Sequence, residues 1–63
     1  MFNKFKKGEF VIVCGYGEEK GTLYINKMAI VIERDPYYKD YHIQFEDGTE
    51  DWFLPKYLQK VNI

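Results

Sequence analysis

Few of the residues that build covalent or metal-bound structures occur in this sequence. It has one cysteine, Cys14, so no disulfide can form within the chain, and its one histidine, His42, completes no cluster with the spacing of a zinc site. No run of about 20 apolar residues is present, and residues 1–7 lack the apolar core of a signal peptide. The sequence therefore predicts a soluble, intracellular protein with no metal, no cofactor and no membrane partner.

The charges are nearly balanced. Nine basic and ten acidic side chains give a net charge of −1, whereas a protein dedicated to nucleic acids usually carries a basic surplus. At 63 residues the chain is too short for two hydrophobic cores, so we expect a single domain over residues 1–63. Aromatic residues make up 19% of the chain, and each ring buries a large apolar area, so a few rings can form most of the core.

Two apolar stretches predict strands that are apolar on both faces. Residues 9–14 are rich in β-branched and aromatic side chains and are followed by the turn residues of 15–17. Residues 28–32 have the same character and precede Asp35 and Pro36, a pair that favours a turn. Between the two stretches, residues 15–27 contain three glycines, and we expect a long, partly ordered loop there, in which residues 22–25 offer a short apolar stretch for pairing with a neighbour.

The clearest local signal is a hairpin over residues 41–54. Residues 41–45 alternate between apolar and polar, and Asp47-Gly48 separates them from a second strand-like run. Glycine accepts the positive φ that tight hairpin turns require. With Asp47-Gly48 as a two-residue turn, Ile43 lies opposite Trp52. The same register pairs Phe45 with Glu50, Tyr41 with Leu54, Gln44 with Asp51 and His42 with Phe53.

The end of the chain predicts one short turn and one more strand. Pro55 cannot donate a hydrogen bond to a sheet, so residues 55–58 are expected to form a single 3-10 helical turn. Val61 and Ile63 would then lie on a last short strand. The sequence thus predicts an all-β chain of five strands, and closing such a sheet into a small barrel removes its edges.

The order of these features is similar to that of the SH3-like barrel superfold. The likeness rests on residues 7–13, 26–33, 41–48, 50–53 and 58–61, which cover nearly the whole chain. The same pattern resembles small uncharacterised barrel proteins of bacterial phages and mobile elements, and this resemblance implies a five-stranded SH3-like barrel in the bacterial cytoplasm. The segment Pro-Lys-Tyr-Leu at 55–58 is also similar to the Pro-x-x-Tyr-Val segment that lines the peptide groove of SH3 domains, but is one residue shorter.

The sequence offers little to a catalytic mechanism. Nucleophilic catalysis needs a nucleophile, a base and an orienting group within reach of one another, and the candidates are Cys14 and His42. Cys14 ends an apolar strand, where a free thiol acts as a small buried hydrophobe. The acidic residues around the hairpin turn lack the spacing of a calcium loop. We therefore predict a binding protein that is not an enzyme and has no catalytic residue.

Aromatic residues indicate where such a protein makes contact. Six tyrosines, five phenylalanines and one tryptophan are more rings than so small a core encloses, and exposed Tyr and Trp are enriched at interface hot spots. Trp52 has two interpretations, a core residue opposite Ile43 or a contact residue. We expect another protein as the partner, bound through an aromatic surface beside an acidic hairpin. The predicted contact residues are Tyr37, Tyr38, Trp52, Glu46, Asp47, Glu50 and Asp51.

Nucleic-acid binding is the alternative function. Lysines interleaved with aromatic rings can combine phosphate contacts with base stacking, and lysines near the two ends of the chain would converge if the terminal strands are neighbours. That set consists of Lys4, Lys6, Lys7, Lys56, Tyr57 and Lys60. The same lysines can equally serve to keep the surface soluble. A small-ligand pocket would have to form between copies of the chain, so self-association also remains open.

Overall fold

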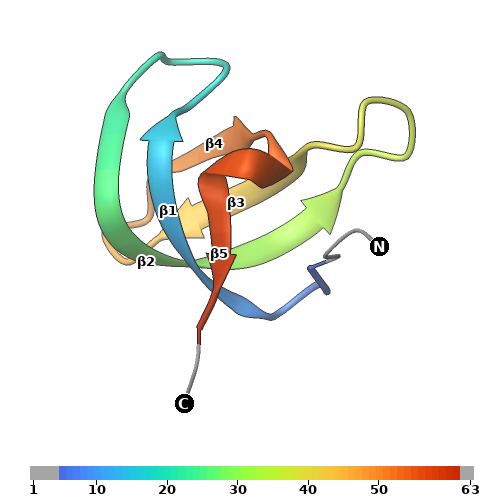
Figure 1. Ribbon diagram of the computed structural model, residues 1–63, viewed down its shortest axis with the longest axis horizontal. Helices are drawn as coiled ribbons and strands as arrows, with labels where there is room; N and C mark the ends of the chain where they lie inside the picture. The colour runs from blue at the N-terminus through green and yellow to red at the C-terminus, as the bar shows by residue number, and fades with distance from the viewer. Residues whose placement is uncertain (1–4, 62–63) are drawn as a thin grey trace.

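The computed structural model describes residues 5–61, which form one antiparallel sheet of five strands (Figure 1). The strands are β1 (Phe10–Tyr16), β2 (Leu23–Arg34), β3 (Tyr41–Phe45), β4 (Glu50–Phe53) and β5 (Leu58–Lys60). A 3-10 turn, η1 (Pro55–Tyr57), precedes β5. The order across the sheet is β4-β3-β2-β1-β5. The predicted all-β class, five strands and late 3-10 turn are confirmed, whereas the sheet is curled but not closed, with β4 and β5 as its edges.

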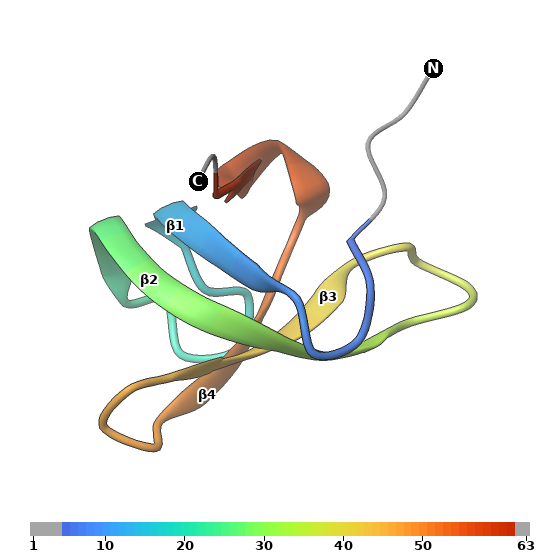
Figure 2. The same cartoon turned by 90° about the horizontal axis from the view of Figure 1, so that it is seen from below.

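The second strand is longer than the sequence pattern predicts. Tyr16 pairs with Leu23 at one end of β1 and Phe10 pairs with Ile30 at the other, so the expected extent of the loop over residues 15–27 is wrong. The pairing considered for residues 22–25 is found at Leu23 and Tyr24. Only residues 17–22 join β1 to β2. The pairing shifts register between Val13 and Gly15, and again where β2 pairs with β3. Such irregularities bend a strand, and β2 curves around the rest of the sheet in both ribbon views (Figures 1 and 2).

The turn between β3 and β4 has three residues. The N–H of Gly48 donates to the Phe45 carbonyl at 2.9 Å, and the N–H of Phe45 donates to the Thr49 carbonyl at 2.8 Å. Gly48 has a φ of 91°, as expected when a left-handed residue closes a three-residue hairpin loop. The paired residues are Tyr41 with Phe53, His42 with Trp52, Ile43 with Asp51 and Gln44 with Glu50. The predicted register is therefore wrong by one residue.

This shift exchanges the faces of the second hairpin strand, because side chains alternate from one face of a sheet to the other. Asp51, opposite Ile43, points inward and is 1% exposed. Trp52, opposite His42, lies on the outer face and is half-buried. The interpretation of Trp52 as a core residue opposite Ile43 is therefore wrong.

The core lies on the inner face of the curled sheet. It is made of Phe5, Val11, Val13, Ala29, Val31, Tyr41, Ile43, Phe45, Phe53 and Leu58. Phe5 packs edge-on against Tyr41 with ring centroids 5.3 Å apart, and its N–H donates to the Tyr41 hydroxyl at 3.3 Å. At the other end of β3, Tyr24 stacks on Phe45 with centroids 3.9 Å apart. Aromatic pairs thus supply much of the core, as the composition predicts.

The last strand lies earlier than expected. β5 pairs with β1, Leu58 opposite Val13, so the first and last strands are neighbours. Val61 follows β5 instead of belonging to it, and Ile63 is outside the described residues. Within residues 5–61, no helix is long and apolar enough to cross a membrane.

The backbone conformation of Gly48 in the hairpin turn can be tested directly. Replacing Gly48 by alanine should lower the free energy of unfolding by about 1 kcal/mol, because a β-carbon is strained at a φ of 91°. Gly48→Asn should cost less, since asparagine tolerates the left-handed region. Urea denaturation of the three proteins measures the difference. Equal stability of the alanine variant and the wild type would contradict the left-handed conformation of Gly48.

Candidate functional site

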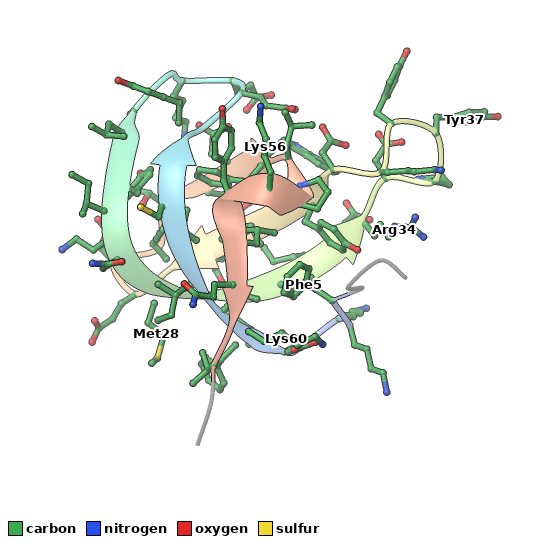
Figure 3. All side chains as sticks on the ribbon, in the orientation of Figure 1. Phe5, Met28, Arg34, Tyr37, Lys56 and Lys60 are labelled. Carbon is green, nitrogen blue, oxygen red and sulfur yellow. The ribbon has the colours of Figure 1, made fainter. Side chains whose placement is uncertain are left out.

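The turn between β2 and β3 presents two tyrosines to solvent. Tyr37 is 86% exposed and Tyr38 is 77% exposed, and Figure 3 shows Tyr37 projecting away from the body of the molecule. The Asp35 carboxylate fixes the turn, since its Oδ1 accepts the N–H of Tyr37 at 2.7 Å and that of Tyr38 at 3.0 Å. The Asp35 N–H in turn donates to the Asp40 carbonyl at 2.9 Å. Both rings are exposed, as expected of contact residues, and these hydrogen bonds hold the backbone of the turn in place.

A second aromatic surface lies on the outer face of the adjacent hairpin. The rings of His42 and Trp52 stack at 4.8 Å with an interplanar angle of 12°. His42 Nε2 lies 2.9 Å from Glu50 Oε1, and its Nδ1 lies 3.7 Å from Glu33 Oε2. The 2.9 Å contact with Glu50 and the stacking hold the imidazole against the indole, whereas His42 Nδ1 is buried with no hydrogen-bond partner among the described residues. Only Tyr41 separates His42 from residues 35–40, which form the tyrosine turn.

The remaining acidic residues of the predicted site do not gather at one place. Glu46 and Asp47 are exposed on the β3–β4 turn, at the opposite end of β3 from Tyr37 and Tyr38 (Figures 1 and 2). Five strand residues separate the two turns by about 17 Å. Asp47 serves its own turn, because its Oδ1 accepts bonds from the hydroxyl and N–H of Thr49, which hold the pKa of that carboxyl below its usual range.

Asp51 has a structural role in this arrangement. Its buried carboxylate accepts the N–H groups of Glu19 at 2.9 Å and Lys20 at 3.1 Å, so it fixes the loop between β1 and β2 against β4. A β-carbon at residue 17 would collide with this carboxylate, so Gly17 is required for the close approach. Asp51 is therefore not part of the exposed acidic surface, and no local sequence pattern marks it as buried.

The sequence also gave no sign of a carboxyl pair formed by Glu18 and Asp40. A side-chain hydrogen bond to Asp40, burial and the negative charges of Asp40, Asp51 and Asp35 raise the pKa of Glu18 to about 7. Asp40 is 8% exposed, and its Oδ1 is buried without a hydrogen-bond partner among the described residues. The pair joins the β1–β2 loop to the end of the tyrosine turn, so both loops meet through carboxyl groups.

No family model, curated protein or solved structure matches this chain. The function proposed below therefore rests on the exposure, hydrogen bonding and charge of the chain's own residues. Among residues 5–61, no group of three or more His, Cys, Asp or Glu side chains is arranged to hold a metal ion.

The predicted nucleic-acid set is divided between two regions. Lys60 lies beside Phe5 and pairs with Glu9 at 3.1 Å, whereas Lys56 lies at the other end of the η1–β5 segment (Figure 3). Tyr57 is half-buried against the core, with its ring packed over Gly15. Lys6 and Lys7 are exposed, and Lys4 is outside the described residues. The lysines near the two ends of the chain thus do not form one continuous basic surface over the described residues.

The two residues considered for catalysis lie on different strands. Cys14, expected as a buried hydrophobe, is exposed on β1. His42 is on β3, and β2 lies between those strands. A shallow hollow of about 320 Å³ is found elsewhere, lined by Tyr24, Lys27, Met28, Phe45, Glu46 and Asp47. Its volume is at the small end of the range for ligand pockets, about 300–1,000 Å³.

Removing the Asp51 carboxylate should destabilise the fold. Asp51→Ala leaves the N–H groups of Glu19 and Lys20 without their acceptor, and lost bonds to a charged group cost about 3 kcal/mol in total. Asp51→Asn keeps one acceptor oxygen and should fall between alanine and wild type. Glu46→Ala is the matched control, because Glu46 is an exposed acid on the same hairpin. Chemical denaturation measures all four proteins, and similar losses for the two alanine variants would contradict this role.

The Glu18 pair predicts that stability depends on pH. The pKa of Glu18 is about 7 in the folded chain and 4.5 for an ordinary glutamate, so the folded state holds more protons between these values. Stability is therefore greatest below pH 4.5 for this group and is lost as pH rises through 7. We expect a higher melting temperature for the wild type at pH 5.5 than at pH 8. Glu18→Gln should reduce this difference, and an unchanged difference would contradict the pairing.

Proposed function

We propose that this protein is a non-catalytic binding module that contacts another protein through the tyrosine turn between β2 and β3. The observation that carries the proposal is the exposure of Tyr37 and Tyr38, at 86% and 77%. Tyrosine combines rigid apolar area with a polar hydroxyl, and it is enriched among the residues that dominate binding energy. Two adjacent rings with no packing role in the described part of the chain fit such a contact.

The hydrogen bonding of the turn supports this function. Asp35 fixes the N–H groups of both tyrosines, and the Lys39 N–H donates to the Asp35 carbonyl at 3.1 Å. A turn that is already ordered loses less conformational freedom on binding than a flexible one. The tyrosine side chains are therefore presented at a low entropic cost.

The neighbouring outer face extends the contact. Trp52 and its stacked partner His42 lie close to the turn, with Glu33 and Glu50 on either side of the imidazole. A standard interface covers about 800 Å² on each partner, roughly 28 Å across. It would reach from the tyrosine turn to Glu46 and Asp47, about 17 Å away. A partner with basic groups opposite these carboxylates fits this surface best.

The curled sheet is consistent with a small SH3-like barrel of the kind that resembles phage and mobile-element proteins. In that setting the chain acts in the bacterial cytoplasm as an accessory or inhibitory protein. Five antiparallel strands, a 3-10 turn before the last strand and neighbouring first and last strands support this assignment. Closure between β4 and β5 is the one feature of a barrel that the described strand pairings lack.

Replacing both turn tyrosines tests the proposed contact. Immobilised wild-type protein should retain a partner from a bacterial lysate, and Tyr37→Ala/Tyr38→Ala should reduce its recovery about tenfold or more, because hot-spot truncations cost about 2 kcal/mol or more. Ile25→Ala is the control, since Ile25 is an exposed apolar residue on β2, away from the tyrosine turn. Mass spectrometry of the retained proteins measures the effect. An identical set of proteins on wild type and double variant would exclude the turn.

A titration distinguishes nucleic-acid binding from the proposed protein binding. A labelled single-stranded oligonucleotide is added to the wild-type protein at low and at high salt, because phosphate contacts are strongest at low salt. The protein-binding proposal expects no binding under either condition. Tight binding at low salt that weakens steeply with salt would favour the lysine set instead.

A further inference from the structure

The outer face of β1 and β2 is apolar and uncovered by any described residue. Alternation along β1 places Phe10, Ile12 and Tyr16 on this face, and pairing places Ile30, Met28 and Leu23 beside them in that order. Phe10 is 55% exposed, Met28 53%, Tyr16 56% and Leu23 48%. These six residues, with the exposed Cys14, are called the apolar strip below.

The absence of charge from the apolar strip restricts which kind of partner can cover it. None of its seven residues is charged. Its neighbours across the sheet are neutral amides, since Gln59 pairs with Ile12 from β5 and Gln44 pairs with Ile30 from β3. The strip itself offers no cationic group to a nucleic acid or an anionic surface, and the exposed Lys27 beside Met28 shares its hollow with Glu46 and Asp47. An equally apolar and uncharged surface is the complementary partner, and the strip has that chemistry itself.

A second copy of the chain satisfies this requirement. In a two-fold dimer the same patch meets itself, and an uncharged patch does so without placing like charges opposite one another. Chains below about 70 residues commonly gain stability from disulfides, metals or oligomerisation. This chain has one cysteine and so forms no internal disulfide, and burial of the apolar strip between two copies would add to a core that is small at this length.

The area of the apolar strip, taken together with the neighbouring strands β5 and β3, limits how tightly two copies can bind. The seven residues of β1 extend about 23 Å, and the four strands from β5 to β3 span about 19 Å in width. The face therefore measures about 400 Å² in projection, so two copies bury less than the 1,200–2,000 Å² of a standard interface. This area fits a weak, reversible dimer.

We propose that the apolar strip on the outer face of β1 and β2 is the interface of a reversible homodimer. Phe10, Ile12, Met28 and Ile30 form its centre, and Gln44 and Gln59 form its polar edges. The tyrosine turn lies outside this interface, so dimerisation leaves the proposed protein-binding contact accessible. The two proposals can fail independently.

Sedimentation velocity of the full chain tests the dimer first. The mass should rise from one chain to two as the concentration increases from about 5 µM to about 500 µM, the range that suits a weak contact. Added salt should not weaken the dimer, because the strip carries no charge. A mass of one chain at every concentration would overturn the proposal. Binding of this monomer to vesicles of neutral phosphatidylcholine would then identify a lipid surface as what covers the strip.

Charged substitutions then locate the interface. Met28→Lys and Phe10→Lys should each raise the dissociation constant about tenfold or more, and a mixture of Met28→Lys with Met28→Glu should recover association. Tyr37→Lys is the matched control, because Tyr37 is more exposed than either residue but lies outside the strip. Far-UV circular dichroism checks that each variant is folded. A dimer disrupted by Tyr37→Lys and not by the strip variants would refute the assignment.

Cys14 provides a test that needs no substitution. Its exposed thiol lies within the strip, so its reaction with a thiol reagent should slow severalfold between the lowest and highest protein concentrations. The reaction is compared with that of a small free thiol under the same conditions. A constant rate while the mass doubles would show that copies associate through another surface, and would also overturn the proposal.

Discussion

Three residues lie between Phe45 and Thr49, which close the β3–β4 turn, and this number determines which side chains of the hairpin are buried and which are exposed. Gly48, at a φ of 91°, closes the turn and sets Ile43 opposite Asp51. The Asp51 carboxylate is then on the inner side of the sheet, where it would be costly to bury without partners. The backbone N–H groups of Glu19 and Lys20 supply them. The order of the β1–β2 loop therefore depends on the register of a distant turn.

The same carboxylate influences the proposed contact surface through a chain of neighbours. Asp51 holds the loop that carries Glu18, and Glu18 bonds to Asp40 at the base of the tyrosine turn. The backbone carbonyl of Asp40 also accepts the N–H of Asp35. The Asp35 carboxylate in turn fixes the backbone of Tyr37 and Tyr38. The turn is thus tied at its base to both a buried acid and a protonatable pair. Its rigidity is a property of the whole end of the sheet and not of the turn sequence alone.

Much of the fold could be predicted because it depends on local pattern. The β-branched run of β1, the alternation of β3 and the proline that begins η1 each specify one element. The register could not be predicted, because Glu46-Asp47-Gly48 suits both a two-residue and a three-residue turn. Burial of Asp51 depends on contacts with residues 31 and 32 positions away, which no local pattern contains. Likewise, β2 begins at Leu23 where Tyr24 stacks on Phe45, a contact between distant segments.

A single curled sheet has one inner face, and 63 residues leave nothing in the described chain to cover the other. The two halves of the outer face differ in polarity, although neither half is buried inside the molecule. Beside β3 and β4 it carries His42, Gln44 and Glu50, whose side chains bond to one another across the strands. Beside β1 and β2 it carries apolar side chains about half exposed. A face that served only solubility would be polar throughout. The proposed dimer covers the apolar half as far as Gln44, and it leaves His42, Glu50 and the tyrosine turn accessible.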